Sequence, residues 1–382
     1  AEEDLTDGKD NDCDGESDER WDIDEVETDL DIGFRSSIQV DGSGKAHIVF
    51  NNVDDGEVLY TNITSDGVWA EDFVVVSDEG YSGEYLDAEM DGSGTLHIGY
   101  TMDTDYTREL TYVSRASGGT WSGETNIDGG GTGELDRGQY VDIAVHTGSW
   151  GTTASFAYLN GDHGTPMLAD ILIEVPGVPV PPIVVPAGTS YWDEMSGLPS
   201  GMYTTLDIDS SGMHHIAFYD PNAEFGFDPQ LQYSQFDYDL DRLLPEEETV
   251  ISEESNETSM KIRNEDDVPC LAYQESGAHD LRFGCREEGG WTFETIAGTG
   301  LTGAQPSLVI NAADEYFITY YNESNRDLML ASKQKDAGWV LTEIDTEGDV
   351  GQNSSLSIGP DGKLHVSYYD ASNRTLRYAK GF

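Results

Sequence analysis

Four stretches of this 382-residue chain repeat one short design, and this repetition limits the fold more than any other feature. Each stretch contains an alternating strand, a glycine-containing turn, and a second alternating strand that a histidine opens. The four stretches are SIQVDGSGKAHIVF (37–50), AEMDGSGTLHIGY (88–100), LDIDSSGMHHIAFY (206–219) and LSIGPDGKLHVSYY (356–369). In each, a turn glycine precedes the histidine by three residues, as Gly44 precedes His47. A recurrent unit of this kind predicts a repeat architecture.

The spacing of the histidines predicts seven units of about fifty residues each. His47, His97, His215 and His365 are separated by 50, 118 and 150 residues. These separations correspond to one period, two periods with an insertion, and three periods. The same phase assigns the histidine position of the three remaining units to Ser155, Cys270 and Phe317.

Tryptophans mark a fourth strand in the units and indicate how the array ends. Trp69, Trp121, Trp291 and Trp339 each follow a glycine-containing turn and open a strand. The last unit lacks such a strand, whereas Trp21–Val26 is one strand in excess. We therefore expect an all-β fold: a seven-bladed β-propeller of four-stranded antiparallel blades, closed by an N-terminal outer strand in the last blade. The predicted domains are an acidic leader at 1–19 and a propeller at 20–382, whose last blade is 353–382 plus 20–28.

The net charge excludes several classes of partner. The chain has 75 acidic residues against 19 lysines and arginines, a formal net charge of −56. Nucleic acids and anionic membranes need a basic surface, so we expect neither as a partner. No window approaches the roughly 18 consecutive apolar residues of a membrane span. The acidity is typical of a surface adapted to salt, and it also suits divalent cations and cationic partners.

Two of the three cysteines are expected to form a disulfide. Cys270 and Cys285 fall in adjacent predicted strands joined by a short loop, where residues come within disulfide range. Such a bond implies an oxidising compartment, so we expect a secreted protein or one at the bacterial cell surface or in the periplasm. Ala1 would then be a mature end after processing. Cys13 is left over, either free or paired outside this chain.

The leader carries a candidate metal site. Residues 1–19 contain almost no apolar side chain. Their candidate ligands, which alternate before Gly15 and then follow it, are Asp10, Asp12, Asp14, Asp18 and Glu19. Alternate carboxylates before a glycine can wrap a hard cation, because the glycine permits a sharp turn. The EF-hand pattern is not met, since the twelfth position from Asp10 is Trp21. The alternative is a disordered acidic leader.

The run DGKDNDCDGESDE (7–19) is similar to the short Asp- and Cys-containing metal-binding motif of the MopE type. It also resembles the calcium loops of thrombospondin type 3 repeats. Such motifs often carry an earlier cysteine, at a place that Thr6 occupies here. The resemblance implies a secreted bacterial seven-bladed β-propeller with calcium bound in the leader.

A ligand site is expected on the face that carries the loops after the second strand of each blade, because these loops vary most between units. The loops combine carboxylates with aromatic side chains, which suits hydrogen bonding to sugar hydroxyls and stacking on a sugar ring. The candidate residues are Tyr106, Asp220, Phe225, Phe227 and Asp228. Ordinary loop decoration is the alternative.

No enzyme signature stands out. The sequence has no G-x-S-x-G, H-E-x-x-H or phosphate-loop motif, and its carboxylates are too plentiful to single out a glycosidase pair. Arg326 and Arg374 share a repeat position, which favours a scaffold role over a sialidase-type arginine cluster. The repeated histidines are also expected to be structural, with hydrogen bonds between blades, because sevenfold geometry holds them too far apart to share one metal.

These features favour a non-enzymatic extracellular binding protein for a glycan or a protein ligand, with calcium in its leader. One alternative is a structural or assembly component of a cell-surface or extracellular complex, joined to its partner through Cys13 or the proline-rich segment 176–186. That segment is expected to be extended or at a sheet edge, since proline cannot donate to a β-ladder. Another alternative is a sialidase-like glycoside hydrolase or a polysaccharide lyase.

Overall fold

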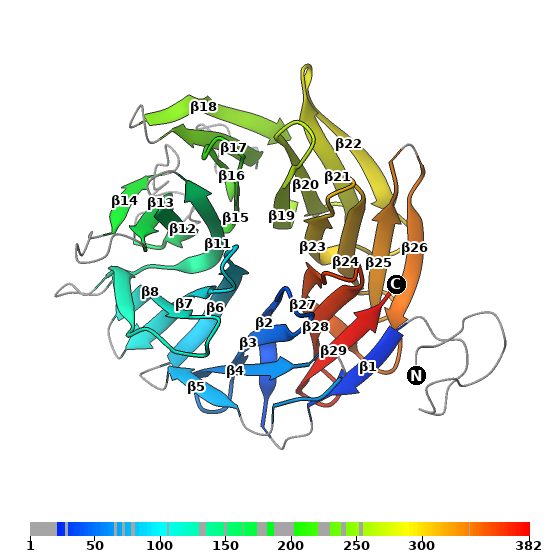
Figure 1. Cartoon of the computed structure of the whole chain (residues 1–382). Helices are drawn as coiled ribbons and strands as arrows, with labels where there is room; N and C mark the ends of the chain where they lie inside the picture. Colours follow the sequence, from blue (N-terminus) through cyan, green and yellow to red (C-terminus); the bar gives the residue numbers. More distant parts are fainter. Residues whose placement is uncertain are drawn as a thin grey trace.

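The structure, a computed structural model, is a ring of seven β-sheets around a central opening (Figure 1). It describes residues 21–26, 30–64, 67–70, 73–77, 81–104, 107–129, 135–148, 151–162, 164–173, 182–186, 202–220, 230–237, 242–251, 255–335 and 337–382. This described part of the chain contains no helix, and so none that could cross a membrane. The predicted fold class, a seven-bladed β-propeller, is confirmed.

In each blade the first strand lies at the central opening and the fourth at the rim (Figure 1). Blade 1 contains β2 (Ile32–Val40), β3 (Ala46–Asn52), β4 (Glu57–Ile63) and β5 (Val74–Ser77). Blade 2 contains β6 (Tyr81–Met90), β7 (Leu96–Thr104), β8 (Thr107–Arg115) and β9 (Thr125–Asp128), and a short strand β10 (Leu135–Asp136) pairs in parallel with β8. Blade 3 contains β11 (Gln139–Gly148), β12 (Gly151–Asn160), β13 (Thr165–Leu172) and β14 (Ile183–Pro186).

The other four blades follow the same antiparallel order. Blade 4 contains β15 (Met202–Ile208), β16 (His214–Asp220), β17 (Gln230–Asp237) and β18 (Arg242–Ile251). Blade 5 contains β19 (Ser255–Arg263), β20 (Val268–Glu275), β21 (Asp280–Glu287) and β22 (Gly290–Ala297). Blade 6 contains β23 (Ala304–Ile310), β24 (Tyr316–Asn322), β25 (Asp327–Lys333) and β26 (Val340–Asp345). Blade 7 contains β27 (Val350–Ile358), β28 (Leu364–Asp370), β29 (Thr375–Gly381) and β1 (Trp21–Glu25).

The N-terminal strand completes blade 7, as predicted. β1 pairs antiparallel with β29, from Trp21 opposite Gly381 to Glu25 opposite Arg377. The Arg377 guanidinium donates to Glu25 Oε2 across this pair at 2.9 Å. Strand pairing and a partly buried ion pair therefore join the two ends of the described chain and close the ring.

The core consists of layers between neighbouring blades. One cluster packs Val49 and Tyr60 of blade 1 against Leu86 and Ile98 of blade 2, and all four side chains are buried. Every blade also buries a tyrosine completely, on its third strand in blades 1 and 4 and on its second strand in the others: Tyr60, Tyr100, Tyr158, Tyr233, Tyr273, Tyr320 and Tyr368. Trp121 contacts the Tyr60 ring edge-on, with 5.4 Å between ring centroids. The alternating strands thus place one apolar face against each neighbouring blade.

The repeated histidines are structural, but their hydrogen bonds lie within blades, so the predicted bonds between blades are wrong. His47 Nδ1 is 2.6 Å from the Tyr60 hydroxyl, and His47 Nε2 is 3.2 Å from Asp41 Oδ2. All three residues belong to blade 1, because the histidine faces the third strand and the turn that ends the first. The same trio recurs as Asp91, His97 and Tyr112 in blade 2 and as Asp209, His215 and Tyr233 in blade 4.

Blade 7 departs from this trio. Gly359 occupies the place of the aspartate, and the buried His365 Nε2 has no hydrogen-bond partner among the described residues. Burial, with Lys380 and Lys363 nearby, lowers the pKa of His365 to about 4. His365 is therefore neutral at physiological pH.

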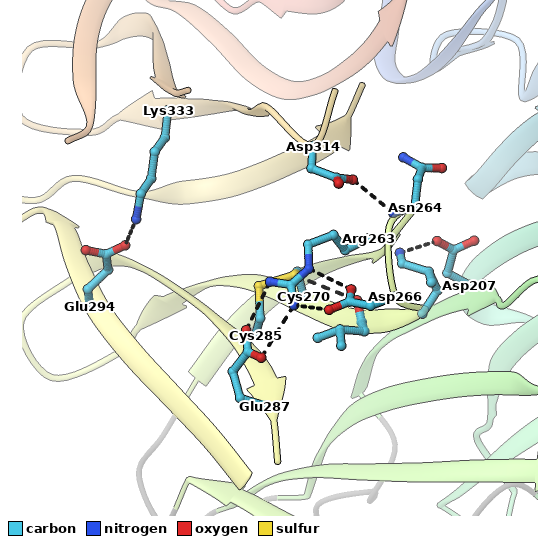
Figure 2. The surroundings of a disulfide bond; sticks show 12 residues. Asp207, Arg263, Asn264, Asp266, Cys270, Cys285, Glu287, Glu294, Asp314 and Lys333 are labelled. Carbon is cyan, nitrogen blue, oxygen red and sulfur yellow. Dashed lines mark hydrogen bonds and ion pairs between the residues drawn. A yellow bond between two sulfur atoms is a disulfide. The ribbon is translucent and has the colours of Figure 1, made fainter. Parts of the chain in front are cut away.

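The predicted disulfide between Cys270 and Cys285 is present, and it joins directly paired residues of β20 and β21 (Figure 2). Cys270 lies at the histidine position of blade 5, as the repeat phase predicted. Beside it, the Arg263 guanidinium donates to Asp266 and to Glu287, at 2.6 Å and 3.0 Å. The bond and the ion pairs together fix one end of blade 5.

Two further predictions are confirmed for the described residues. The end of the proline-rich segment forms β14, an outermost strand at the edge of blade 3. Arg326 and Arg374 each pair with a carboxylate of the following blade, Asp349 and Asp31 respectively. The two arginines thus act as scaffold contacts between blades.

Candidate binding site at the mouth of the central channel

All seven first strands bulge at the same place, close to their starts. The register of β11 against β12 shifts between Gln139 and Asp142, and that of β23 against β24 shifts between Ala304 and Ser307. A β-bulge re-aims the side chain that it contains. In every blade that side chain lines the end of the central cavity, and together the seven form what we call the mouth ring: Arg35, Tyr85, Tyr140, Tyr203, Glu257, Gln305 and Asn353.

The backbone of the mouth ring is unusual. Five of its residues have a positive φ although none is glycine: Tyr140 (53°), Tyr203 (52°), Glu257 (42°), Gln305 (54°) and Asn353 (49°). Left-handed conformations cost free energy for residues with a Cβ atom and cluster at functional sites. The fold therefore holds these five side chains in place against a local backbone preference.

Just inside the mouth lies a second circle of side chains, which we call the linker ring. Each member accepts a hydrogen bond from a backbone N–H of the next blade, over 2.8 to 3.2 Å. The seven members are Ser37, Asp87, Asp142, Thr205, Ser259, Ser307 and Ser355. The circle is continuous, since Ser355 of blade 7 accepts from Ile38 of blade 1.

One half of the mouth ring is aromatic. The Tyr85 and Tyr140 ring centroids are 4.8 Å apart, and those of Tyr140 and Tyr203 are 4.9 Å apart. The Arg35 guanidinium lies over the Tyr85 ring, 5.7 Å from its centroid. Burial raises the pKa of Tyr85 and Tyr140, and raises that of Tyr203 to about 12. All three hydroxyls are therefore protonated at neutral pH.

The other half of the mouth ring is a chain of hydrogen bonds. The Gln305 N–H donates to Glu257 Oε2 at 2.7 Å, and the Asn353 N–H donates to Gln305 Oε1 at 2.7 Å. Asn353 Oδ1 accepts from Gln305 Nε2 and from Arg35 Nη1. Two buried donors, Arg35 Nε and Asn353 Nδ2, have no partner among the described residues. Buried donors of this kind are costly unless an acceptor reaches them.

Below the mouth is a cavity of about 520 Å³ that follows the first strands. Lys261 of blade 5 reaches Glu89 of blade 2, with 3.9 Å between Nζ and Oε2, and so crosses the channel between nearly opposite blades. Burial alone would lower the pKa of Lys261, but Glu89, Asp207 and other channel carboxylates raise it. Burial also raises the pKa of Glu89, and burial together with Asp87 raises that of Asp142. The channel interior is thus polar, and its charged groups are partly buried.

The predicted ligand residues lie mostly outside the described residues. This holds for Tyr106, Phe225, Phe227 and Asp228, and also for Cys13 and the leader carboxylates Asp10, Asp12, Asp14, Asp18 and Glu19. Asp220, which is described, ends β16 and is half-buried. It lies at the same end of blade 4 as Tyr203, because β15 and β16 are antiparallel and Met202 pairs with Tyr219. The face on which the loop sequences predicted a ligand site is therefore the face on which the mouth ring lies.

The mouth ring was not predicted from the sequence, although a signal for it exists. A glycine stands two residues before the mouth-ring residue in six of the seven units, and three of these read GEY, GQY and GMY. Where described, this glycine has a positive φ, as in Gly303 (102°). A Cβ atom at Gly303 would lie 2.5 Å from the backbone nitrogen of Leu281 in the preceding blade. The glycine is thus required by close packing between blades, and it marks the bulge that follows.

Comparisons with known proteins show the fold and no more. No protein-family model and no curated protein sequence matches the chain. Virginiamycin B lyase from Staphylococcus aureus is similar in structure, with a TM-score of 0.57 and 11% identity over 95% of this chain and 100% of that chain. A PL25 ulvan lyase also gives 0.57, at 11% identity over 90% and 91%. A six-bladed fungal lectin, the Aleuria aurantia lectin, which recognises fucose, gives 0.50, at 10% identity over 82% and 95%.

Proposed function

We propose that this chain is a non-enzymatic extracellular binding protein that takes a glycan at the mouth ring. The observation that carries the proposal is the composition of this ring, in which three neighbouring tyrosines face a polar half that contains two unpartnered donors. Aromatic rings stack on the apolar face of a sugar, and amide, guanidinium and carboxylate groups match its hydroxyls. The cavity volume lies within the range of about 300–1,000 Å³ that is typical of ligand pockets.

The tyrosine pKa values favour binding over catalysis. A tyrosine that acts as a nucleophile or base needs a lowered pKa. Here burial raises the pKa of Tyr85, Tyr140 and Tyr203. These hydroxyls are suited to donate hydrogen bonds to a ligand.

The compared proteins support the scaffold for this role. The Aleuria aurantia lectin recognises fucose and the ulvan lyase was solved with a saccharide, and both resemble this chain in fold. A polysaccharide lyase is therefore the second candidate. The disulfide supports an extracellular or periplasmic location. We also propose that the leader binds calcium through the acidic residues at 10–19, which calorimetric titration of calcium with and without residues 1–19 would test.

A glycan array followed by calorimetry tests the proposed function. The full chain should bind at least one oligosaccharide, and Tyr140→Ala should weaken that binding about tenfold or more. Tyr81→Ala is the matched control, because Tyr81 is 68% exposed and lies outside the mouth ring. Equal losses in both variants, or no binding by the wild type, would overturn the proposal. Release of unsaturated uronates from a polysaccharide would favour the lyase instead.

A further inference from the structure

The mouth ring surrounds the opening of the channel on every side. Its residues come from all seven blades, and the first strands behind them surround one central opening (Figure 1). A long chain that lay across the face would contact the mouth ring only from above. A chain that entered along the channel axis would contact both halves of the ring.

The channel offers space below the mouth, and an ion pair crosses this space. The cavity of about 520 Å³ continues inward from the mouth ring along the first strands. The Lys261–Glu89 pair crosses the channel deeper inside. A ligand that enters from the mouth therefore ends within the cavity, which favours the terminus of a chain over an internal segment.

The polar groups at the mouth and those deeper in the cavity suit the hydroxyl-rich terminus of a glycan. At the mouth, Arg35 Nε and Asn353 Nδ2 are buried donors without a partner among the described residues, and Asn353 is only 8% exposed. They require an acceptor oxygen. Deeper in the cavity, the carboxylates of Glu89 and Asp207 offer acceptors to hydroxyl donors. Sugar hydroxyls both donate and accept, so a terminal sugar ring satisfies both sets of groups.

The charge of the channel favours a neutral sugar. Among the described residues that line it, Lys261 and Arg35 are the two cations, and the five carboxylates are those of Asp87, Glu89, Asp142, Asp207 and Glu257. The chain as a whole has a formal net charge of −56. An anionic sugar would meet repulsion during approach and in the cavity.

We propose that the channel mouth binds the terminal sugar of a neutral glycan chain end-on, with the last ring inside the cavity. This inference rests on the proposed function and specifies its ligand class. It also specifies the depth of binding, since the deeper residues Val309 and Ser357 would then line the occupied space.

The test varies the length of the ligand and, separately, places larger side chains in the cavity. The probes are linear oligosaccharides of glucose, mannose, galactose and N-acetylglucosamine with one to six rings, titrated into the full chain by calorimetry. End-on binding predicts that affinity stops rising after about two rings, because a pocket of this size buries about one drug-sized ligand. Each protein chain should bind one oligosaccharide, whatever its number of rings. Uronate-ended counterparts should bind more weakly.

The blocking variants are Val309→Phe and Ser357→Phe, which add bulk at two positions that line the cavity and lie outside the mouth ring. Either should weaken binding about tenfold or more while the melting curve stays cooperative. Val340→Phe is the matched control, because Val340 lies in the same blade on its outermost strand and is 55% exposed.

The outcomes separate this inference from the proposed function. Binding that Tyr140→Ala weakens but both blocking variants leave intact would keep the proposed function and overturn the end-on mode. Affinity that grows steadily to six rings, or a preference for uronate ends, would also overturn this inference. The absence of any oligosaccharide binding by the wild type would overturn both.

Discussion

The mouth ring and the linker ring are neighbouring circles of seven side chains on the same strands, and they differ in one respect. Every member of the linker ring is a serine, threonine or aspartate, and each makes the same hydrogen bond to the next blade. The mouth ring contains arginine, tyrosine, glutamate, glutamine and asparagine. The linker ring thus makes the same type of hydrogen bond in every blade, whereas the side chains of the mouth ring differ from blade to blade.

This contrast distinguishes scaffold from candidate function within a repeat protein. Blade closure needs the same acceptor seven times, so uniformity at a position indicates structure. A ligand has no sevenfold symmetry, so a binding site must break the repeat. The criterion also applies to Arg326 and Arg374, which share a position and both pair with the next blade.

The largest expected loss of stability comes from Lys261, whose position holds different residue types in other blades although its role is structural. Lys261→Met should destabilise the protein by about 2 kcal/mol at pH 8, because it removes the cation that faces Glu89 and other partly buried carboxylates of the channel. The pKa of Glu89 is already raised by burial and should rise further. A raised carboxyl pKa costs stability as pH increases, so the loss should be smaller at pH 5. Urea denaturation at both pH values measures it, and an equal loss at both would contradict this account.

The linker ring lines the cavity but should affect stability more than binding. Ser307→Ala removes the acceptor of the Leu356 N–H, and an unsatisfied buried donor costs about 1–3 kcal/mol. Ser307→Thr should restore most of that loss, since Thr205 performs the same task in blade 4. Denaturant titration compares the variants. A change in glycan affinity with no change in stability would break the distinction between the two rings.

The mouth ring should show the opposite behaviour. Tyr203→Phe keeps the aromatic ring and removes one hydroxyl donor, so glycan affinity should fall by about 1 kcal/mol, or roughly fivefold. Stability should stay within about 0.5 kcal/mol, because Tyr203 is half-buried at the cavity end. Calorimetry and thermal melting together check both halves of this prediction.

The smallest expected effect on stability concerns His365, the repeated histidine beside which Gly359 takes the place of the aspartate. The pKa of His365 is about 4 in the fold, below the ~6.5 of an unfolded chain. As pH falls from about 6.5 to 4, the unfolded chain takes up the proton first and the fold loses stability. Gly359→Asp combined with Asp361→Ser would recreate the turn of blade 1, and should regain about 1 kcal/mol at pH 5.

The gain should be smaller at pH 8, where the histidine is neutral in both states and the new aspartate adds a hydrogen bond without an ion pair. A Cβ atom at Gly359 would approach Asp361 Oδ1 and His365 Nε2, at 2.7 and 2.8 Å, and the serine removes the first conflict. The reciprocal control, Asp91→Gly in blade 2, should reduce acid stability through His97. Equal stability of wild type and variant at pH 5 would contradict the role assigned to the aspartate.

Much of the fold could be predicted from sequence, because its markers are local. The glycine three residues before His47 and the tryptophans after the turns fix the blade period, and the spare strand at Trp21 indicates the closure. The pairing of Cys270 with Cys285 follows from their adjacent strands. These inferences depend on residues close together in the chain.

The candidate site could not be predicted in the same way. Tyr140, Gln305 and Asn353 come from three blades and line one cavity only because the ring closes, and the glycine two residues before each of them marks a bulge without indicating which side chain follows. The bonding of His47 was also misjudged, because its Tyr60 partner is set by strand register and not by spacing. Contacts between blades depend on the whole ring.

The closing strand β1 can pair with β29 only after the chain has been synthesised as far as β29. Residues 21–25 are made early, yet their partners in β29 begin at residue 375. At about 5–20 residues per second, this strand waits roughly 20 to 70 s for its partner. During that interval its hydrogen-bonding edge is open to other chains. β1 is short and its sequence, WDIDE, holds three carboxylates. Like charges of this density repel a second copy, so nascent chains are protected from joining one another before each ring closes.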